Sequence, residues 1–319
     1  MLRSVLLTFV FCLLASAAGA GEGPSSWMPT QADARRAIAN NPEPPSRLTP
    51  LQSLPSLPLT QQNVGTIRSV RVKDGQKVVA LTFDLCELAS VTTGCDMGIL
   101  GFLRRENVAA TLFMGGKWMR THADRVRLLL QQTDIFEIGN HAWTHGNFAL
   151  LDDNGMREQV LWTQAQYELL AESAGILQGG QSALGVPRLF RLPYGRCNER
   201  ALRQLASLGM RVIQWNVVAE SGSDNTNLKI ARQEAQRVAS QISPGAIVLF
   251  HANLVPKGSA NLLREFVSIL RHEGYSFVKV SALLDMGTPE MTMDGYFERP
   301  GDNHALDGKF GKNGTGLSN

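Results

Sequence analysis

Short apolar runs alternate with longer amphipathic stretches from about residue 65 onward, and this alternation restricts the fold more than any other feature of the sequence. The apolar runs resemble buried strands and cover residues 66–72, 77–84, 108–114, 136–140, 189–192, 211–215, 247–250 and 277–280. Helical spacing of apolar residues marks 97–106, 118–132, 153–176, 198–208, 227–241 and 259–273. Strands and helices in alternation predict parallel α/β architecture, either a barrel of about seven strands or an open doubly wound sheet.

The two ends of the chain differ in composition from this central region. Residues 1–20 carry Arg3, a short apolar run and the small-residue end Ala18-Gly19-Ala20, which predicts a cleaved signal peptide and a secreted or periplasmic protein. An uncleaved anchor is the alternative, although the run is shorter than the ~20 residues of a membrane span. Residues 21–64 predict a Pro-rich linker, 65–285 the folded domain and 286–319 a flexible C-terminal tail.

Charge and cysteine usage restrict the partners and the covalent chemistry. The formal net charge is only +3, and no run of Lys or Arg favours nucleic acid. Of four cysteines, Cys12 would leave with the signal peptide, so that Cys86, Cys95 and Cys197 remain. An oxidising compartment allows one disulfide, either Cys86–Cys95 or Cys86–Cys197, and the spacing does not choose between them.

Polar residues follow several of the predicted strands, at the edge where barrel enzymes place their active sites. Asp84, Arg191 and His251 each end or follow an apolar run. Arg191 could pair with Asp84 and orient it. His141 and His145 are four residues apart, so that one helical turn would point both imidazoles at one cation, although such a pair alone is as often structural.

Taken together, these motifs resemble the polysaccharide deacetylases, which form carbohydrate esterase family 4 and share the NodB homology domain. The resemblance is carried by Thr82-Phe83-Asp84, Asn140-His141, Thr144-His145, Arg191-Leu192-Pro193-Tyr194-Gly195 and Leu249-Phe250-His251, in the family's order. It spans about residues 76–285 and implies a distorted (β/α) barrel with a divalent metal, often Zn²⁺.

The resemblance also implies a role for each matching residue. His141 and His145 correspond to metal ligands, Asp84 to the general base that activates water, and His251 to the general acid. Arg191 corresponds to the residue that positions the base, and the backbone N–H of Tyr194 to the donor that stabilises the oxyanion. Trp215 and Leu249 correspond to the walls of the pocket for the acetyl methyl group.

Two positions depart from the family pattern. The family places a third metal ligand, an Asp, where this chain has Leu85, which has no donor atom. Asp84, Cys86 or Glu87 could replace that donor, and we predict Glu87. The family also often places an Asp, paired with the arginine, at the position of Val218, and Glu220 is nearby at a different offset.

The sequence thus predicts a metal-dependent hydrolase that removes N-acetyl groups from a chitin-like polymer, peptidoglycan or a related exopolysaccharide. An O-acetyl polysaccharide esterase would use the same residues with an easier leaving group. The departures at Leu85 and Val218 also fit a non-catalytic carbohydrate-binding relative that has lost its metal.

Overall fold

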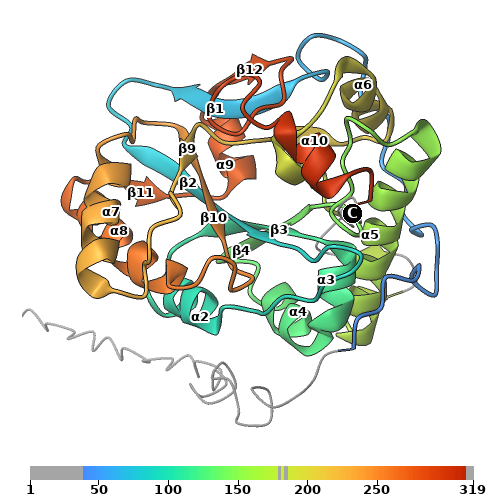
Figure 1. Ribbon diagram of the computed structural model, residues 1–319, viewed down its shortest axis with the longest axis horizontal. Helices are drawn as coiled ribbons and strands as arrows, with labels where there is room; N and C mark the ends of the chain where they lie inside the picture. The colour runs from blue at the N-terminus through green and yellow to red at the C-terminus, as the bar shows by residue number, and fades with distance from the viewer. Residues whose placement is uncertain (1–38, 179–180, 183–185, 314–319) are drawn as a thin grey trace, which may run out of the picture.

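The computed structural model describes residues 39–178, 181–182 and 186–313, and its centre is a closed barrel (Figure 1). Around the ring, the strands are β2 (Val78–Leu85), β3 (Ala110–Met114), β4 (Phe136–Asn140), β7 (Leu189–Phe190), β8 (Arg211–Ile213), β1 (Thr66–Val72) and β10 (Ala246–His251). β9 (Val217–Val218), β11 (Ser276–Phe277) and β12 (Gly287–Thr292) extend the sheet, and β5 (Leu177–Gln178) pairs separately with β6 (Gln181–Ser182). The predicted barrel is confirmed, which excludes the open sheet.

β1 is the strand that makes the barrel mixed rather than parallel throughout. It runs parallel to β8 but antiparallel to β10 and β12. The turn at residues 73–76, with Gly75 at φ 80°, joins β1 directly to β2 and reverses the chain. Because β10 is parallel to β2, β1 must oppose β10, and β10 lies between the two strands that the turn connects.

Helices surround the barrel in Figure 1 and mostly follow the predicted ranges. They are α2 (Met97–Arg105), α3 (Gly116–Thr121), α4 (Ala123–Leu130), α5 (Asp153–Ser173), α6 (Glu199–Ser207), α7 (Leu228–Ala239), α8 (Ser259–His272), α9 (Val280–Asp285) and α10 (Ala305–Phe310). The helix expected at 118–132 is two helices, because the backbone of His122 leaves the helical region at φ −113° and ψ 36°. Among the described helices, none combines the length and apolar character that a membrane span requires.

The two faces of β2 explain how the sequence separates packing from chemistry. Successive strand residues point to opposite faces. Phe83 and Leu85 lie in the apolar layer between the barrel and its helices. Ala80 lies in the interior cluster, and Thr82 and Asp84 follow on that same face. The strand therefore buries one row of side chains outside the barrel and directs the other row toward its interior.

The segments that flank the barrel differ from expectation. The predicted signal peptide and the first part of the linker lie outside the described residues. The rest of the linker packs on α5, where the buried Glu168 accepts hydrogen bonds from the backbone of Leu51 and Gln52 and pairs with Arg47 at 3.2 Å.

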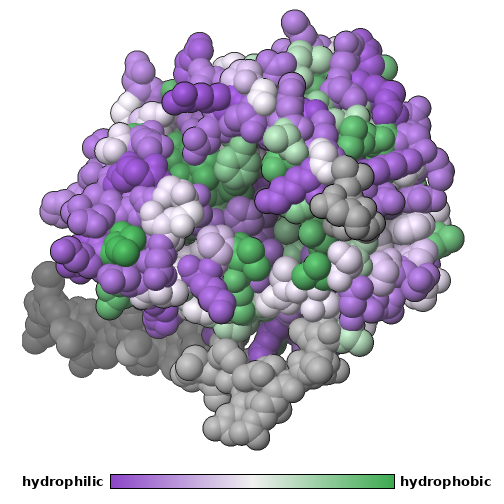
Figure 2. Space-filling view, viewed as in Figure 1, coloured by the Kyte–Doolittle hydropathy of each residue, from purple (hydrophilic) through white to green (hydrophobic). Residues whose placement is uncertain are grey.

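The surface of the molecule is largely hydrophilic with scattered hydrophobic groups, as the face in Figure 2 shows.

The described part of the expected C-terminal tail is structured, which corrects that prediction. β12 pairs with β1 from Thr66↔Thr292 to Val72↔Gly287, and α10 lies farther along. The strand was missed because it contains Pro289 and lacks an apolar alternation, and its stability comes from backbone pairing with β1. This pairing brings the C-terminal segment back toward the barrel.

Candidate active site

The carboxyl ends of the barrel strands bring the predicted polar residues together. Asp84 near the end of β2 is the register partner of His251 at the end of β10. His141 follows β4, and its backbone N–H bonds to the end of β3. Arg191 follows β7, and its backbone N–H bonds to Asn140 of β4. Residues far apart in the sequence thus share one end of the barrel, as expected for this architecture.

Asp84 is held between a guanidinium and an imidazole. Its side chain is 6% exposed. Oδ1 accepts a hydrogen bond from Arg191 Nη1 at 3.0 Å, and Oδ2 lies 3.3 Å from His141 Nε2. A buried carboxylate needs a charged or hydrogen-bonding partner, and Arg191 supplies it in the pairing that we expected.

Arg191 is fully buried and fixed on every side. Besides Asp84, its guanidinium donates to two backbone carbonyls at the end of β8, each at 3.2 Å. The ring of Phe113 lies 4.1 Å from its Cζ atom and the ring of Trp215 lies 5.3 Å from it. The guanidinium therefore cannot turn without losing several contacts, and it holds Asp84 in one orientation.

The two histidines stand on a bent loop rather than on the helical turn that we predicted. Ala142 and His145 have positive φ values of 66° and 58°, a left-handed conformation that is uncommon for residues other than glycine. The rings still come together, edge to face, with centroids 4.8 Å apart. Strained backbone of this kind is frequent where a loop must present side chains to a ligand.

Both imidazoles have the protonation that a metal ligand needs. Burial lowers the pKa of His141, and the nearby Asp84 only partly opposes this effect. Burial, together with the neighbouring histidines, lowers the pKa of His145 further. Nδ1 of His141 bonds to the Arg191 carbonyl at 2.9 Å, which orients the ring and leaves Nε2 toward the site.

Unpartnered buried atoms at this point fit a bound cation. Within the described residues, Nε2 of His141 and Nδ1 of His145 are buried and make no hydrogen bond. A buried polar atom without a partner is costly, and a divalent metal would satisfy both nitrogens. The residues present are therefore compatible with the metal that the family resemblance implies.

Glu87 does not face the histidines, which corrects our prediction of the third ligand. It is buried against α3, where Oε2 lies 3.1 Å from Lys117 Nζ and accepts from Thr121. Oε1 accepts the backbone N–H of Thr93 at 3.0 Å. Because both of its oxygens have partners, the Glu87 carboxylate connects the loop after β2 to α3 and stabilises that loop.

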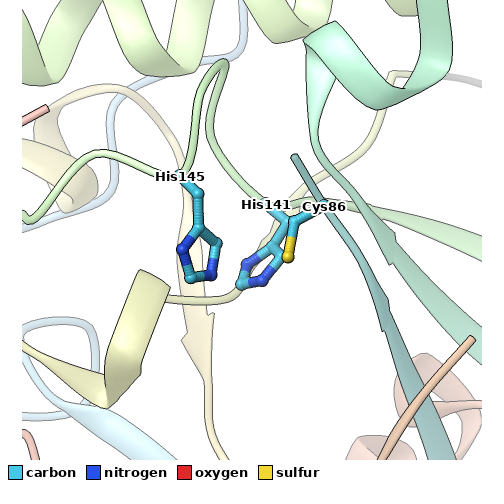
Figure 3. Close-up of side chains that lie close together, drawn as sticks. All are labelled: Cys86, His141 and His145. Atoms are coloured by element: carbon cyan, nitrogen blue, oxygen red, sulfur yellow. The ribbon is translucent and has the colours of Figure 1, made fainter. Parts of the chain in front are cut away.

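Cys86 lies beside the histidines instead. In Figure 3 its sulfur points toward the His141 ring, with His145 next to them, and the three ligand atoms lie within 4.8 Å of one another. Burial, with the charges of Asp84 and Glu87, raises the pKa of this thiol. Cys86, Cys95 and Cys197 are all free thiols in the structure, so that neither of the disulfides we considered is present.

His251 pairs with a carboxylate whose role the sequence did not reveal. Glu220 Oε2 lies 2.6 Å from His251 Nδ1, and Oε1 accepts the His251 backbone N–H at 3.2 Å and a hydrogen bond from Ser259. Burial lowers the pKa of His251, but Glu220 outweighs it and the net shift is upward. The pairing with Glu220 thus favours the protonated form of this imidazole, whose side chain is 27% exposed.

Tyr194 connects the site to the C-terminal segment. It lies in the turn η2 (Pro193–Gly195) with φ 60°. Its ring packs edge-on against His145 at 4.3 Å and stacks on Phe310 of α10 at 4.8 Å. Asn303 donates to its carbonyl at 2.9 Å. The sequence indicated the turn, whereas nothing in it indicated that residues 303–310 would border the site.

Trp215 and Leu249, the expected pocket walls, are buried together in the interior cluster beneath the polar residues. Trp215 donates its Nε1–H to the Phe297 carbonyl at 2.9 Å. Both side chains are at most 2% exposed. They provide an apolar floor, and their contact with an acetyl group remains a prediction.

The geometry of this site agrees with the comparison to known proteins. A family model described as polysaccharide deacetylase matches residues 71–213, which include Asp84, both clustered histidines and Arg191. Over residues 71–213 this chain matches the polysaccharide deacetylase family. The resemblance inferred from the sequence motifs is therefore confirmed.

Individual members of the family are distant in sequence. The peptidoglycan-N-acetylglucosamine deacetylase PgdA of Listeria monocytogenes is 28% identical over 207 residues, which cover 65% of this chain and 39% of that protein. The chain thus spans well under half the length of that relative. The structure of the peptidoglycan deacetylase PdaC from Bacillus subtilis is 28% identical with a TM-score of 0.51, and the match covers 67% of this chain and 93% of that one. A family pseudoenzyme from Bacillus anthracis, 24% identical over 69% of each chain with a TM-score of 0.53, supports the fold alone.

Proposed function

We propose that this protein is a divalent-metal hydrolase that removes N-acetyl groups from an amino-sugar polymer. The observation that carries the proposal is the pairing of Asp84 with His251 across β2 and β10, beside two neutral imidazoles with unpartnered nitrogens. A base, an acid and a cation site then share one barrel end. This combination is what hydrolysis of an unreactive amide requires.

The cation would be held by His141 and His145 with a third donor. When bound, it supplies Lewis acidity that polarises the acetyl carbonyl and lowers the pKa of a coordinated water to about 7. The remaining steps depend on residues of this chain.

Asp84 takes a proton from the water while the water oxygen attacks the carbonyl carbon. Arg191 keeps the accepting carboxylate oriented toward that water. The backbone N–H of Tyr194 faces the developing oxyanion, a contribution of a few kcal/mol in other hydrolases. His251, protonated through its pairing with Glu220, donates a proton to the sugar nitrogen as the C–N bond breaks. The products are acetate and a free amine, and the base and the acid each contribute about 10²–10⁴-fold.

Peptidoglycan is the polymer that we favour as the substrate. PgdA and PdaC are named for activity on peptidoglycan, which supports this choice for a distant relative. The expected signal peptide at residues 1–20 would place the enzyme outside the cytoplasm, secreted or periplasmic, where that polymer lies.

The test is an assay of acetate and free amine released from N-acetylated peptidoglycan fragments and from chitin oligomers. The Asp84→Asn and His251→Ala variants should each lose about 10²–10⁴-fold in kcat. Acetate without a free amine, obtained only from an acetylated xylan, would indicate the O-acetyl esterase instead.

The buried Leu85, at the position of the family's metal-binding Asp, favours a second function. A chain that binds N-acetylated oligomers, retains no divalent metal and releases no acetate would be a carbohydrate-binding relative. That result would overturn the enzymatic proposal.

A further inference from the structure

The alternation of side chains along β2 explains the directions of Leu85 and Cys86. Leu85 is fully buried among the helices outside the barrel, so that its side chain points away from the histidines. Cys86, one residue later, returns to the side of Asp84. The chain thus reaches the site with a thiol one position after the missing carboxylate.

Contacts on both sides of Cys86 hold it at the histidines. Thr93 and Asn253 donate to its backbone carbonyl at 2.8 and 3.1 Å, and the Asn253 amide lies 3.7 Å from Sγ. A side chain at Gly115 would meet the Cys86 Cα at 3.5 Å and the Ala142 carbonyl at 3.2 Å. Glycine at this position therefore allows the loops after β2, β3 and β4 to approach one another closely.

The nearby carboxylates are already occupied. Glu87 is paired with Lys117, and Oδ1 of Asp84 is bonded to Arg191. Oδ2 of Asp84 lies 3.3 Å from His141 and is the competing donor. If Asp84 coordinated the cation, it would no longer be free to act as the base opposite His251.

We propose that Cys86 Sγ is the third protein ligand of the metal, together with a ring nitrogen of His141 and one of His145. The identity of the bound ion as the catalytic metal rests on the proposed function, whereas the ligand set does not. A Cys–His–His set leaves a position open, as in catalytic zinc sites. Because thiolate is a soft ligand, the site should take Zn²⁺ or Co²⁺ and discriminate against Mg²⁺ and Mn²⁺.

Cobalt substitution tests this ligand set directly. The full chain is stripped with a chelator and reconstituted with Co²⁺ alone. We expect one equivalent to bind with a near-ultraviolet thiolate-to-cobalt charge-transfer band, and Zn²⁺ but not Mg²⁺ should displace it. C86S should abolish the band and weaken binding by at least about 100-fold, since loss of a residue that only supports a ligand already costs about 10- to 100-fold.

Two variants separate a ligand from a structural residue. C95S, at another free and partly exposed cysteine, should keep the band and the affinity. C86D should bind Co²⁺ without the band and should admit Mn²⁺ more readily, because an oxygen donor replaces sulfur. Circular dichroism and the urea midpoint should show that C86S remains folded.

Three outcomes would overturn the assignment. They are failure of the wild-type protein to bind Co²⁺, binding without the charge-transfer band, and an unchanged band in C86S. Unchanged affinity in C86S with a loss in D84N would instead assign the ligand to Asp84. A thiolate band without acetate release would leave Cys86 as a ligand and overturn only the proposed function.

Discussion

Glu220 Oε2 lies 2.6 Å from Nδ1 of His251, although Glu220 stands two positions beyond the Asp of the family pattern. The register explains how it reaches the ring, because Val218 of β9 is the partner of Leu249 of β10. Two residues beyond this pair, Glu220 follows β9, His251 ends β10, and the two side chains lie side by side. Glu220, two positions after the buried Val218, thus supplies the carboxylate that pairs with His251.

This pairing predicts the effect of Glu220→Gln on the pH dependence of activity. Glu220 raises the pKa of His251, so that its neutral replacement should lower that pKa. Since His251 must be protonated to act as the acid that we propose, the alkaline limb of the kcat profile should move to lower pH. We expect kcat at neutral pH to fall by about 10- to 100-fold, part of the range for general acid catalysis, with KM little changed.

A pH–rate profile of Glu220→Gln beside Glu265→Gln checks this prediction. Glu265 pairs with Arg232 on the surface and should give the wild-type profile. An unshifted alkaline limb in the Glu220 variant would mean that the carboxylate does not set the protonation of His251.

Asp84→Asn should separate the charge of Asp84 from its position. The amide keeps the shape and can still accept from Arg191, but the buried guanidinium loses its counter-charge. We expect kcat to fall by about 10²–10⁴-fold and the free energy of unfolding to fall by as much as about 3 kcal/mol. Urea unfolding and acetate release, measured on the same sample, test both effects. Activity that stays within about threefold of wild type would exclude Asp84 as the base.

The parts of the site that could be predicted are those at the ends of regular strands. Asp84, Arg191 and His251 follow apolar runs, and parallel strands must bring such positions to one edge of the barrel. The Asp84–Arg191 pair followed from charge and location. These conclusions required only the alternation of apolar and amphipathic segments in the sequence and the chemistry of the side chains.

The other features of the site could not be predicted, because they depend on contacts between segments that are far apart in the sequence. Glu87, which we predicted as the third ligand, does not face the histidines because it pairs with the fully buried Lys117, 30 positions away in sequence. In the histidine loop, Ala142 and His145 have a left-handed backbone conformation, whereas the four-residue spacing of the histidines indicated a helical turn. The partner of Tyr194, Phe310, lies in a segment with little apolar periodicity. Each of these features is set by tertiary packing.

Glu87 and Lys117 form a fully buried ion pair, and this pair predicts a large stability effect. Glu87→Ala leaves the Lys117 ammonium buried without its counter-charge, so that the free energy of unfolding should fall by about 3–5 kcal/mol. Lys117 also donates to the carbonyls of Leu88 and Val91 at 2.9 and 2.8 Å, which hold the loop that carries Cys86. Denaturant unfolding of the variant measures the loss.

The matched control is the double variant Glu87→Gln/Lys117→Met, which removes both charges. It should recover much of the stability, because no uncompensated charge is left buried. A double variant no more stable than Glu87→Ala would show that the hydrogen bonds of Lys117, rather than its charge, dominate.

His122 predicts how acid affects the stability of the fold. The ring is buried at the junction of α3 and α4 and stacks on Trp118 with centroids 4.5 Å apart, and burial lowers its pKa to about 4. An unfolded chain binds this proton near pH 6.5. Between about pH 6.5 and pH 4 the unfolded state therefore holds a proton that the folded state does not, so that stability is full above this window and falls with decreasing pH.

The loss that His122 contributes should reach up to roughly 3 kcal/mol at pH 4. Urea unfolding in the presence of a chelator, compared at pH 7 and pH 4, measures it without a contribution from metal release. His122→Gln should lose less stability over this interval than the wild type by about that amount, whatever its own stability at pH 7. His272→Gln, at an exposed position, should follow the wild type. Equal acid losses in His122→Gln and the wild type would mean that the buried imidazole accepts its proton without leaving the fold.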